Sequence, residues 1–219
     1  MNFPNLLTLL RIFFVPLLVA ALVQEGVHFE WAGFDFPNEF LALAIFLAAA
    51  GTDLLDGYLA RRWGQVTTVG TLLDPIADKL LISAALIALV QVKAVPAWMV
   101  ILIVGREFAI SGLRSIAAAE GYTIRASDLG KTKMVSQVIA ITLLILSTRI
   151  EPVRPWAMLW MWCVVVFSLL SAMAYFRKFW RRIDERVKSR RRRELLLLER
   201  RQKRQRAAAA ARATAKTGL

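Results

Sequence analysis

The stretch that decides the fold covers residues 53–78 and reads DLLDGYLARRWGQVTTVGTLLDPIAD. Its acidic residues are Asp53, Asp56, Asp74 and Asp78. The first two are three residues apart and the last two are four apart, so each pair shares one face if its segment is helical. The stretch overlaps two long apolar runs, 38–60 and 72–91. It therefore predicts two apolar helices whose adjoining ends carry two carboxylates each.

Apolar runs of about 17–25 residues, long enough to cross a bilayer, recur along the chain. They lie near 6–23, 38–60, 72–91, 95–116, 132–148 and 155–176. No alternation of apolar and polar residues indicates a barrel, and helices are the other way to satisfy the backbone in lipid. The first run lacks a basic leader and contains Arg11, which argues against a signal peptide. We expect an all-α polytopic membrane protein with six transmembrane helices.

Charge divides the chain into two parts. The 219 residues are 58% hydrophobic with a net charge of +13. Residues 1–176 hold 12 basic and 12 acidic residues, so the whole excess lies in residues 177–219. The composition argues against a soluble nucleic-acid-binding protein, because the apolar surface exceeds what one core buries. We predict a six-helix membrane domain at 1–176 and a basic, partly helical or disordered cytoplasmic tail at 177–219, attracted to anionic lipid headgroups.

The loops predict the orientation of the membrane domain. Basic residues gather after the second and fourth apolar runs: Arg61, Arg62, Arg125, Lys131 and Lys133. The 24–37 connection has three acidic residues and no Lys or Arg. Because Lys and Arg are retained on the cytoplasmic side, both termini and these two loops are expected in the cytoplasm.

The residue types limit the chemistry. Cys163 is the only cysteine and His28 the only histidine, which excludes an internal disulfide and a thiolate or histidine metal site. Four carboxylates at membrane helix ends cost about 2.5–3.5 kcal/mol each at the bilayer centre and repel one another unless a divalent cation joins them. Hard oxygen ligands favour Mg²⁺ or Mn²⁺, and four could hold two ions. The alternative is a set of interfacial charges paired with Arg61, Arg62 and Lys79.

The spacing D-x-x-D-G-x-x-A-R-x8-G-x3-D-x3-D, from residue 53 to residue 78, resembles the motif of the CDP-alcohol phosphatidyltransferases. The resemblance implies a six-helix, homodimeric enzyme with two metal ions, in which an alcohol attacks the β-phosphorus of a CDP-linked lipid and releases CMP. It implies metal ligation by Asp53, Asp56, Asp74 and Asp78, with Asp78 also the general base. It implies a cytidine and diphosphate pocket lined by Gly57, Ala60, Arg61, Thr67 and Gly70.

The amino terminus is similar to the same family. Asn5, Thr8 and Arg11 match its opening pattern P-N-x-x-T-x-x-R, which implies that they help to hold the nucleotide and its phosphates. Read from the residues alone, Asn5 caps a helix and Arg11 extends its charge toward the interface. Both readings remain open at this point.

A cluster of cations follows on the fourth and fifth apolar runs: Arg106, Arg114, Lys131 and Lys133. The spacing of Arg106 and Arg114 predicts that both rise along one helix face, with Glu107 neutralising or orienting one of them. The surrounding residues, Gln137 among them, resemble the branch of the family whose acceptor is sn-glycerol 3-phosphate and whose donor is CDP-diacylglycerol. The resemblance assigns the acceptor phosphate to these four cations; ordinary cytoplasmic-face charge is the alternative.

Two other functions stay open. The nearer is a sibling enzyme in phospholipid biosynthesis with another acceptor, such as phosphatidylglycerol (a cardiolipin synthase), an inositol phosphate or serine. The remoter is a transporter that uses intramembrane carboxylates for a divalent ion. The enzyme hypothesis places the chain in the plasma membrane with its active site facing the cytoplasm.

Overall fold

The computed structural model describes residues 3–24, 29–31, 34–63, 68–120, 129–181, 188 and 191–192. Nearly all of them are helical. The labelled helices are α1 (Phe3–Val23), α2 (Asn38–Trp63), α3 (Thr68–Gln91), α4 (Ala97–Ala119) and α5 (Leu129–Arg149). A short 3-10 turn, η1 (Glu151–Val153), leads into a further helix over 154–181, here called the C-terminal helix. Each predicted apolar run is thus confirmed as helical, with ends shifted by a few residues.

The connection between α3 and α4 shows how local sequence ends a helix. The amide of Ala94 donates to the carbonyl of Leu89 at 2.9 Å and that of Lys93 to Val90 at 3.0 Å. Lys93 has a φ of 58°. This is the left-handed residue that closes a Schellman motif, a position that usually belongs to glycine. Pro96 then precedes α4 with its φ of −65°, so α3 and α4 are joined by a tight reversal.

The link between α1 and α2 contains a short element that the sequence pattern does not predict. Strands β1 (Phe29–Trp31) and β2 (Phe34–Phe36) pair antiparallel, with Phe29 opposite Phe36. Each strand alternates aromatic and acidic residues, and two residues separate them, as in a short hairpin. The all-α expectation therefore holds except for this hairpin.

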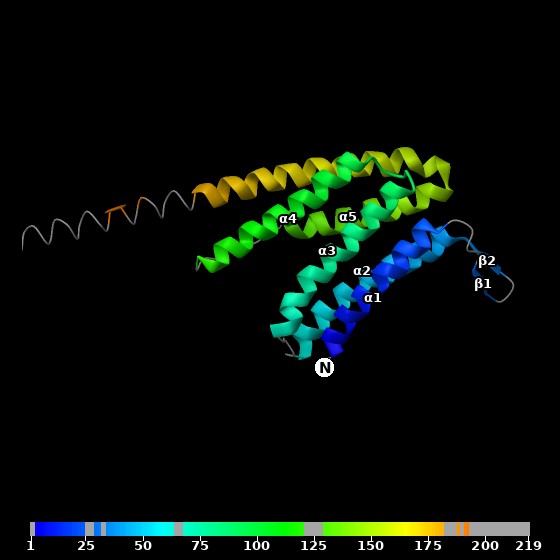
Figure 1. Cartoon of the computed structure of the whole chain (residues 1–219), viewed down its shortest axis with the longest axis horizontal. Helices are drawn as coiled ribbons and strands as arrows, with labels where there is room; N and C mark the ends of the chain where they lie inside the picture. The colour runs from blue at the N-terminus through cyan, green and yellow to red at the C-terminus, as the bar shows by residue number, and fades with distance from the viewer. Residues whose placement is uncertain are drawn as a thin grey trace, which may run out of the picture. The chain divides into compact units, whose positions relative to one another are not determined.

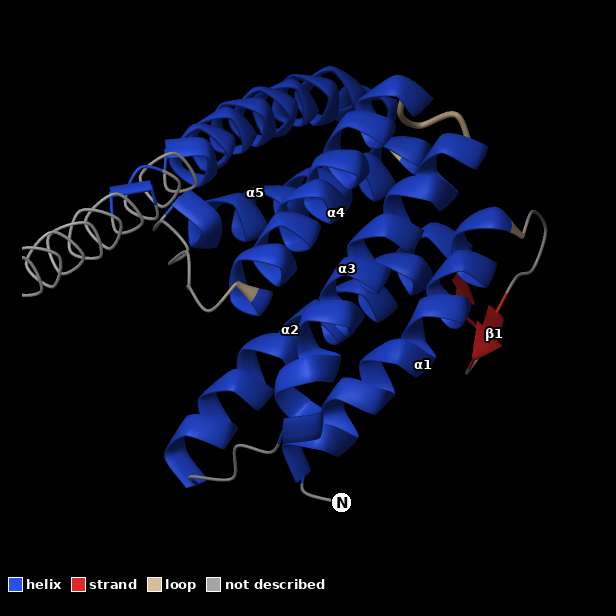
Figure 2. Cartoon of the chain, turned by 60° about the vertical axis from the view of Figure 1, so that its left-hand side comes forward, coloured by secondary structure: helices blue, strands red, loops and turns tan. Residues whose placement is uncertain are grey.

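Helices α1, α2 and α3 pack against one another, α5 packs on α2 and α3, and α4 contacts α3. Figures 1 and 2 show that α1 begins, α2 ends and α3 begins at the same end of the bundle. Small core residues such as Ala49 and Ala85 let these backbones approach closely. The C-terminal helix joins the same core through Met161, and its Trp162 contacts Trp98 of α4 at a ring-centroid distance of 5.3 Å.

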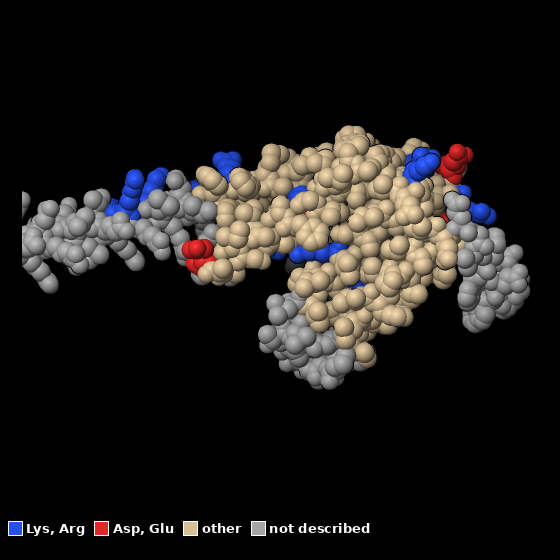
Figure 3. Space-filling view, viewed as in Figure 1, with Lys and Arg blue, Asp and Glu red and all other residues tan. Residues whose placement is uncertain are grey.

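The outside of the bundle is also apolar. Large apolar side chains are exposed on every long helix that the structure describes. Examples are Phe13 (62%), Leu47 (45%), Ile87 (58%), Ile101 (68%), Ile139 (38%) and Leu159 (57%). The face in Figure 3 is correspondingly uncharged over most of the described surface. Apolar exteriors of this extent are typical of a surface that contacts lipid or another protein.

Two segments among the described residues are long and apolar enough to cross a membrane, Leu6–Val23 and Glu151–Arg181. Shorter apolar segments occupy Asn38–Thr52 and Met134–Arg149. By contacts the chain forms two compact units, Met1–Ala172 and Met173–Leu219. In the second unit, Phe176 and Trp180 stack at 5.9 Å. Most of the predicted basic tail lies outside the described residues, and the boundary at 176 stays a prediction.

Candidate active site

The described part of the site begins with two hydrogen bonds between α1 and α3. The hydroxyl of Thr8 donates to Oδ1 of Asp74 at 2.6 Å, and Nη1 of Arg11 donates to Oδ1 of Asp78 at 2.5 Å. Thr8 and Arg11 are one turn apart on α1, and the two aspartates are one turn apart on α3. The two helices therefore match turn for turn, and α1 supplies the donors for both carboxylates.

These contacts are buried on the α1 side. Thr8 is 1% exposed and Arg11 is 0% exposed, whereas the side chain of Asp78 is 29% exposed. A buried guanidinium without a counter-charge would be strongly destabilising, so Arg11 and Asp78 depend on each other. Because one side of Asp78 remains accessible, its carboxylate is fixed by Arg11 and still open toward a ligand. The sequence alone left Arg11 as an extended interfacial charge or a phosphate ligand, and neither reading foresaw this pairing.

The other two predicted metal ligands lie on α2. Asp53 and Asp56 belong to its second half, and α2 packs against α3. Their side chains lie outside the described residues. Among the residues whose side chains are described, no group of three or more potential metal ligands is found. The described half of the set nevertheless fits a hard divalent cation, because Asp74 and Asp78 present carboxylate oxygens on one face of α3.

Most of the remaining predicted ligands also fall outside the side chains described. These are Asn5, Gly57, Ala60, Arg61, Thr67, Gly70, Lys131 and Lys133. Thr67 itself is outside the described backbone, between α2 and α3. The predicted pocket for cytidine and diphosphate is therefore known here only by its sequence position, near the shared end of α1, α2 and α3.

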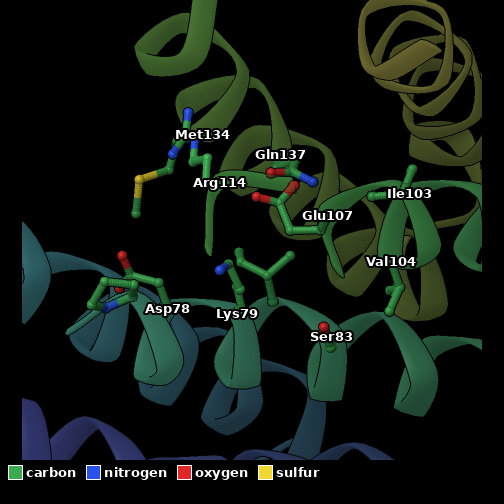
Figure 4. Close-up of a pocket in the computed structure, with 11 residues that line it drawn as sticks. Asp78, Lys79, Ser83, Ile103, Val104, Glu107, Arg114, Met134 and Gln137 are labelled. Carbon is green, nitrogen blue, oxygen red and sulfur yellow. The ribbon is translucent and has the colours of Figure 1, made fainter. Parts of the chain in front are cut away.

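A cavity of about 200 Å³ opens next to Asp78, between α3 and α4, with α5 closing it. Its polar lining consists of Asp78, Lys79, Ser83, Glu107, Arg114 and Gln137. Figure 4 shows Lys79 rising from α3 toward Glu107, with Gln137 beside Glu107 and Arg114 next to Met134. Figure 3 shows Lys and Arg atoms inside a hollow of the molecule on the face in view. The cavity thus joins a fixed carboxylate to cations and to hydrogen-bonding groups.

Arg106 is placed differently from Arg114. Its Nη1 pairs with Oε2 of Glu107 at 2.7 Å, its Nε donates to the carbonyl of Ser168 at 3.2 Å, and its Nη2 donates to the hydroxyl of Ser171 at 2.8 Å. Arg106 is not among the residues that line the cavity. Eight residues at 3.6 per turn leave the two arginines about 80° apart around α4. The expected common helix face is therefore not observed.

Four lining residues were not assigned to the site from the sequence. Lys79 was considered only as a partner for the carboxylates, Glu107 only as a partner for an arginine, and Gln137 only as part of a resemblance. Ser83 was not considered. Lys79 and Glu107 directly follow residues assigned to the site. Ser83 and Gln137 lie about one turn from such a residue on the same helix, and these spacings were the available signal. Which face of each helix lines the cavity depends on how α3, α4 and α5 pack together, and the spacing alone does not give this packing.

Comparison with known proteins points to the same family as the motif from Asp53 to Asp78. The family model described as CDP-alcohol phosphatidyltransferase matches residues 1–170. The chain is 42% identical over 190 residues to the CDP-diacylglycerol–glycerol-3-phosphate 3-phosphatidyltransferase of Bacillus subtilis, covering 83% of this chain and 97% of that protein. It is 31% identical over 179 residues to the protein of that name from Rickettsia bellii, covering 80% and 94%. It is 36% identical over 195 residues to CDP-diacylglycerol–glycerol-3-phosphate 3-phosphatidyltransferase 2 of Arabidopsis thaliana, covering 81% and 79%.

The matched segment includes the whole motif from Asp53 to Asp78, the α1 residues that hold its second half, and the helices around the cavity. The chain belongs to the CDP-alcohol phosphatidyltransferase family, and it is a membrane-embedded enzyme of that class.

Proposed function

We propose that this enzyme transfers the phosphatidyl group of CDP-diacylglycerol to sn-glycerol 3-phosphate, giving phosphatidylglycerophosphate and CMP. The observation that carries the proposal is the cavity beside Asp78, where a carboxylate and two cations, Lys79 and Arg114, line a space suited to a small phosphorylated alcohol. The relatives named for the same reaction agree with this substrate pair.

The four aspartates would hold Mg²⁺ or Mn²⁺, in a site for two ions. Asp53 and Asp56 would contribute from α2, and Asp74 and Asp78 from α3. Bound there, the ions would neutralise the phosphate oxygens and stabilise CMP as the leaving group. Thr8 and Arg11 orient the two α3 carboxylates through the hydrogen bonds described above.

Asp78 would act as the general base. Its carboxylate takes the proton of the 1-hydroxyl of glycerol 3-phosphate as that oxygen attacks the β-phosphorus. The new bond joins the acceptor oxygen to phosphorus, and the bond between this phosphorus and the bridging oxygen of CMP breaks in line. The proton leaves Asp78 to solvent through its exposed side. No covalent enzyme intermediate is required.

The remaining roles follow the family pattern. Asn5, Gly57, Ala60, Arg61, Thr67 and Gly70, together with Thr8 and Arg11, would form the CDP-lipid side of the site. Arg114, Lys131 and Lys133 would bind the acceptor phosphate, by bidentate and point-charge contacts. Arg106, the fourth cation of that set, would act on the acceptor through Glu107, because its hydrogen bonds to Ser168 and Ser171 turn it toward the C-terminal helix.

We further propose six membrane spans with both termini in the cytoplasm, so that the site opens to soluble glycerol 3-phosphate. The lipid donor would enter laterally, with its acyl chains among the exposed apolar side chains of the helices. The enzyme would work as a homodimer in the plasma membrane, and the basic tail would lie against anionic headgroups.

The deciding experiment measures CMP release by the purified protein with CDP-diacylglycerol and a panel of acceptors. Glycerol 3-phosphate should support turnover with Mg²⁺ or Mn²⁺ and none with chelator. Preference for phosphatidylglycerol, an inositol phosphate or serine would instead identify a sibling enzyme. Divalent-ion flux into liposomes without CDP-lipid, and no CMP release, would identify a transporter.

A further inference from the structure

The cavity beside Asp78 contains a buried amide that the reaction described above does not use. Gln137 on α5 is 7% exposed and lines the cavity. Within the part of the chain that the structure describes, its side chain has no hydrogen-bond partner. Because the amide lies at the cavity wall, its donor and acceptor are available to water or to a ligand in the cavity.

Lys79 lines the same cavity from the opposite wall. It follows Asp78 directly in the sequence and is half-buried. Among the described residues its ammonium group takes part in no ion pair. Figure 4 shows the side chain reaching from α3 into the space below Glu107. A half-buried cation that faces a cavity attracts an anion into it, since the low dielectric strengthens the interaction.

Glu107 connects the two groups. Its carboxylate is fixed by Arg106 at 2.7 Å, and its side chain is 31% exposed. In Figure 4 it lies between Gln137 and Lys79. Because Arg106 is itself anchored to Ser168 and Ser171 of the C-terminal helix, Glu107 has a defined orientation at the cavity wall. The wall therefore offers one fixed carboxylate, one amide and one ammonium.

We infer that Gln137 and Lys79 are acceptor-binding residues that determine specificity: Lys79 contacts the acceptor phosphate and Gln137 hydrogen-bonds the secondary hydroxyl. The inference rests on the proposed function and names the part of the site that selects the acceptor. An amide both donates and accepts, which matches a hydroxyl, whereas an ammonium group matches a phosphate. With the primary hydroxyl at Asp78, both other groups of a three-carbon acceptor lie along the cavity.

The test compares two acceptors that differ by one hydroxyl, glycerol 3-phosphate and 3-hydroxypropyl phosphate. The wild type should favour glycerol 3-phosphate by roughly tenfold or more in kcat/KM, since a site built to bond a hydroxyl rejects the analogue that lacks it. Gln137→Leu should bring this ratio close to one. Lys79→Met should raise the KM of both acceptors by a similar factor, about tenfold, because both carry the phosphate.

Matched controls are available at the end of α3 and in the turn after it. Gln91→Leu and Lys93→Met make the same replacements at exposed positions away from the cavity, and they should leave both KM values unchanged. The KM for CDP-diacylglycerol should be unaffected in every variant. If Gln137→Leu does not fold, Gln137→Asn shortens the side chain while keeping the amide, and it should still lower the ratio several-fold.

The outcomes separate the two proposals. An unchanged preference for glycerol 3-phosphate in Gln137→Leu or Gln137→Asn would overturn the role of Gln137. A KM unchanged by Lys79→Met would overturn that of Lys79. A wild-type protein that releases no CMP with either acceptor would contradict the proposed function itself.

Discussion

Asp78 is the residue on which the chemistry depends most, because it is held by Arg11 on one side and faces the cavity on the other. Asp78→Asn keeps an oxygen for Arg11 but removes the base. We expect kcat to fall by about 100-fold or more, the usual contribution of a general base, and the melting temperature to fall as well, because buried Arg11 loses its counter-charge. CMP release and thermal unfolding measure the two effects. Glu151→Gln, an exposed carboxylate-to-amide change, is the control, and normal turnover by Asp78→Asn with metal present would sink the general-base role.

A substitution of Thr8 tests whether this residue supports the metal site or contacts the nucleotide. Thr8→Val removes the hydroxyl that donates to Asp74 and keeps the shape of the side chain. Partners that orient metal ligands change metal affinity by about 10–100-fold, so the Kd for Mn²⁺ should rise at least tenfold. Titration of Mn²⁺ without substrate gives this value. A raised KM for CDP-diacylglycerol with unchanged Mn²⁺ binding would return Thr8 to the nucleotide site.

These residues also show what sequence can and cannot provide. The spacing of Asp74 and Asp78 is local, so their shared face follows from helix geometry alone. The pairing of Thr8 with Asp74 joins residues 66 positions apart and depends on the register between α1 and α3. A single sequence does not encode that register in any local pattern. The same reason explains why Gln137 was noticed in a motif but not placed in a cavity.

At the scale of elements, α4 is attached to the C-terminal helix through Arg106. The side chain is 9% exposed and donates to Ser168 and Ser171 as well as to Glu107. Arg106→Ala should therefore lower the free energy of unfolding by about 2 kcal/mol, since it strands buried acceptors. Arg114→Ala, at an exposed position on the cavity, should leave stability unchanged and raise the KM for glycerol 3-phosphate about tenfold.

Thermal unfolding and acceptor kinetics of the two variants decide between these roles. An unchanged melting temperature for Arg106→Ala, together with an acceptor KM as high as that of Arg114→Ala, would place both arginines on the phosphate. The spacing of four residues suggested that arrangement. Arg106 and Arg114 are two steps of four residues apart, and together these steps rotate about 80° around the helix. This rotation is too large to keep both side chains on one narrow face.

The reversal between α3 and α4 gives a prediction about stability alone. Lys93 has a φ of 58°, which costs a non-glycine residue about 1 kcal/mol. Lys93→Gly should therefore raise the free energy of unfolding by roughly 0.5–1 kcal/mol, less the added entropy of the unfolded chain. Lys93→Ala, which keeps the strain, should show no gain. Equal stability of the two variants would mean that the left-handed position carries no measurable strain.

At the scale of the whole molecule, charged residues interrupt several helices of the membrane domain. They explain why only two of the described helices are long and continuously apolar enough to cross a membrane. On α3 and α4 the charges of Asp78, Lys79 and Glu107 face the cavity, while large apolar side chains such as Ile87 and Ile101 face outward. A helix of this kind is interrupted in sequence and yet apolar on its exterior. Ionisable residues that face a shared interior are what a membrane-embedded site requires.

This arrangement predicts a topology that labelling can test. In a Cys163→Ser background, single cysteines at Gln24, Ala119 and Glu151 occupy exposed helix ends. Because basic residues follow α2 and α4 whereas the 24–37 connection has none, Ala119→Cys should lie in the cytoplasm and the other two outside. A membrane-impermeant maleimide should label Gln24→Cys and Glu151→Cys in intact cells, and Ala119→Cys only after permeabilisation. Labelling of Ala119→Cys in intact cells would reverse the orientation and move the acceptor cavity away from the cytoplasmic supply of glycerol 3-phosphate.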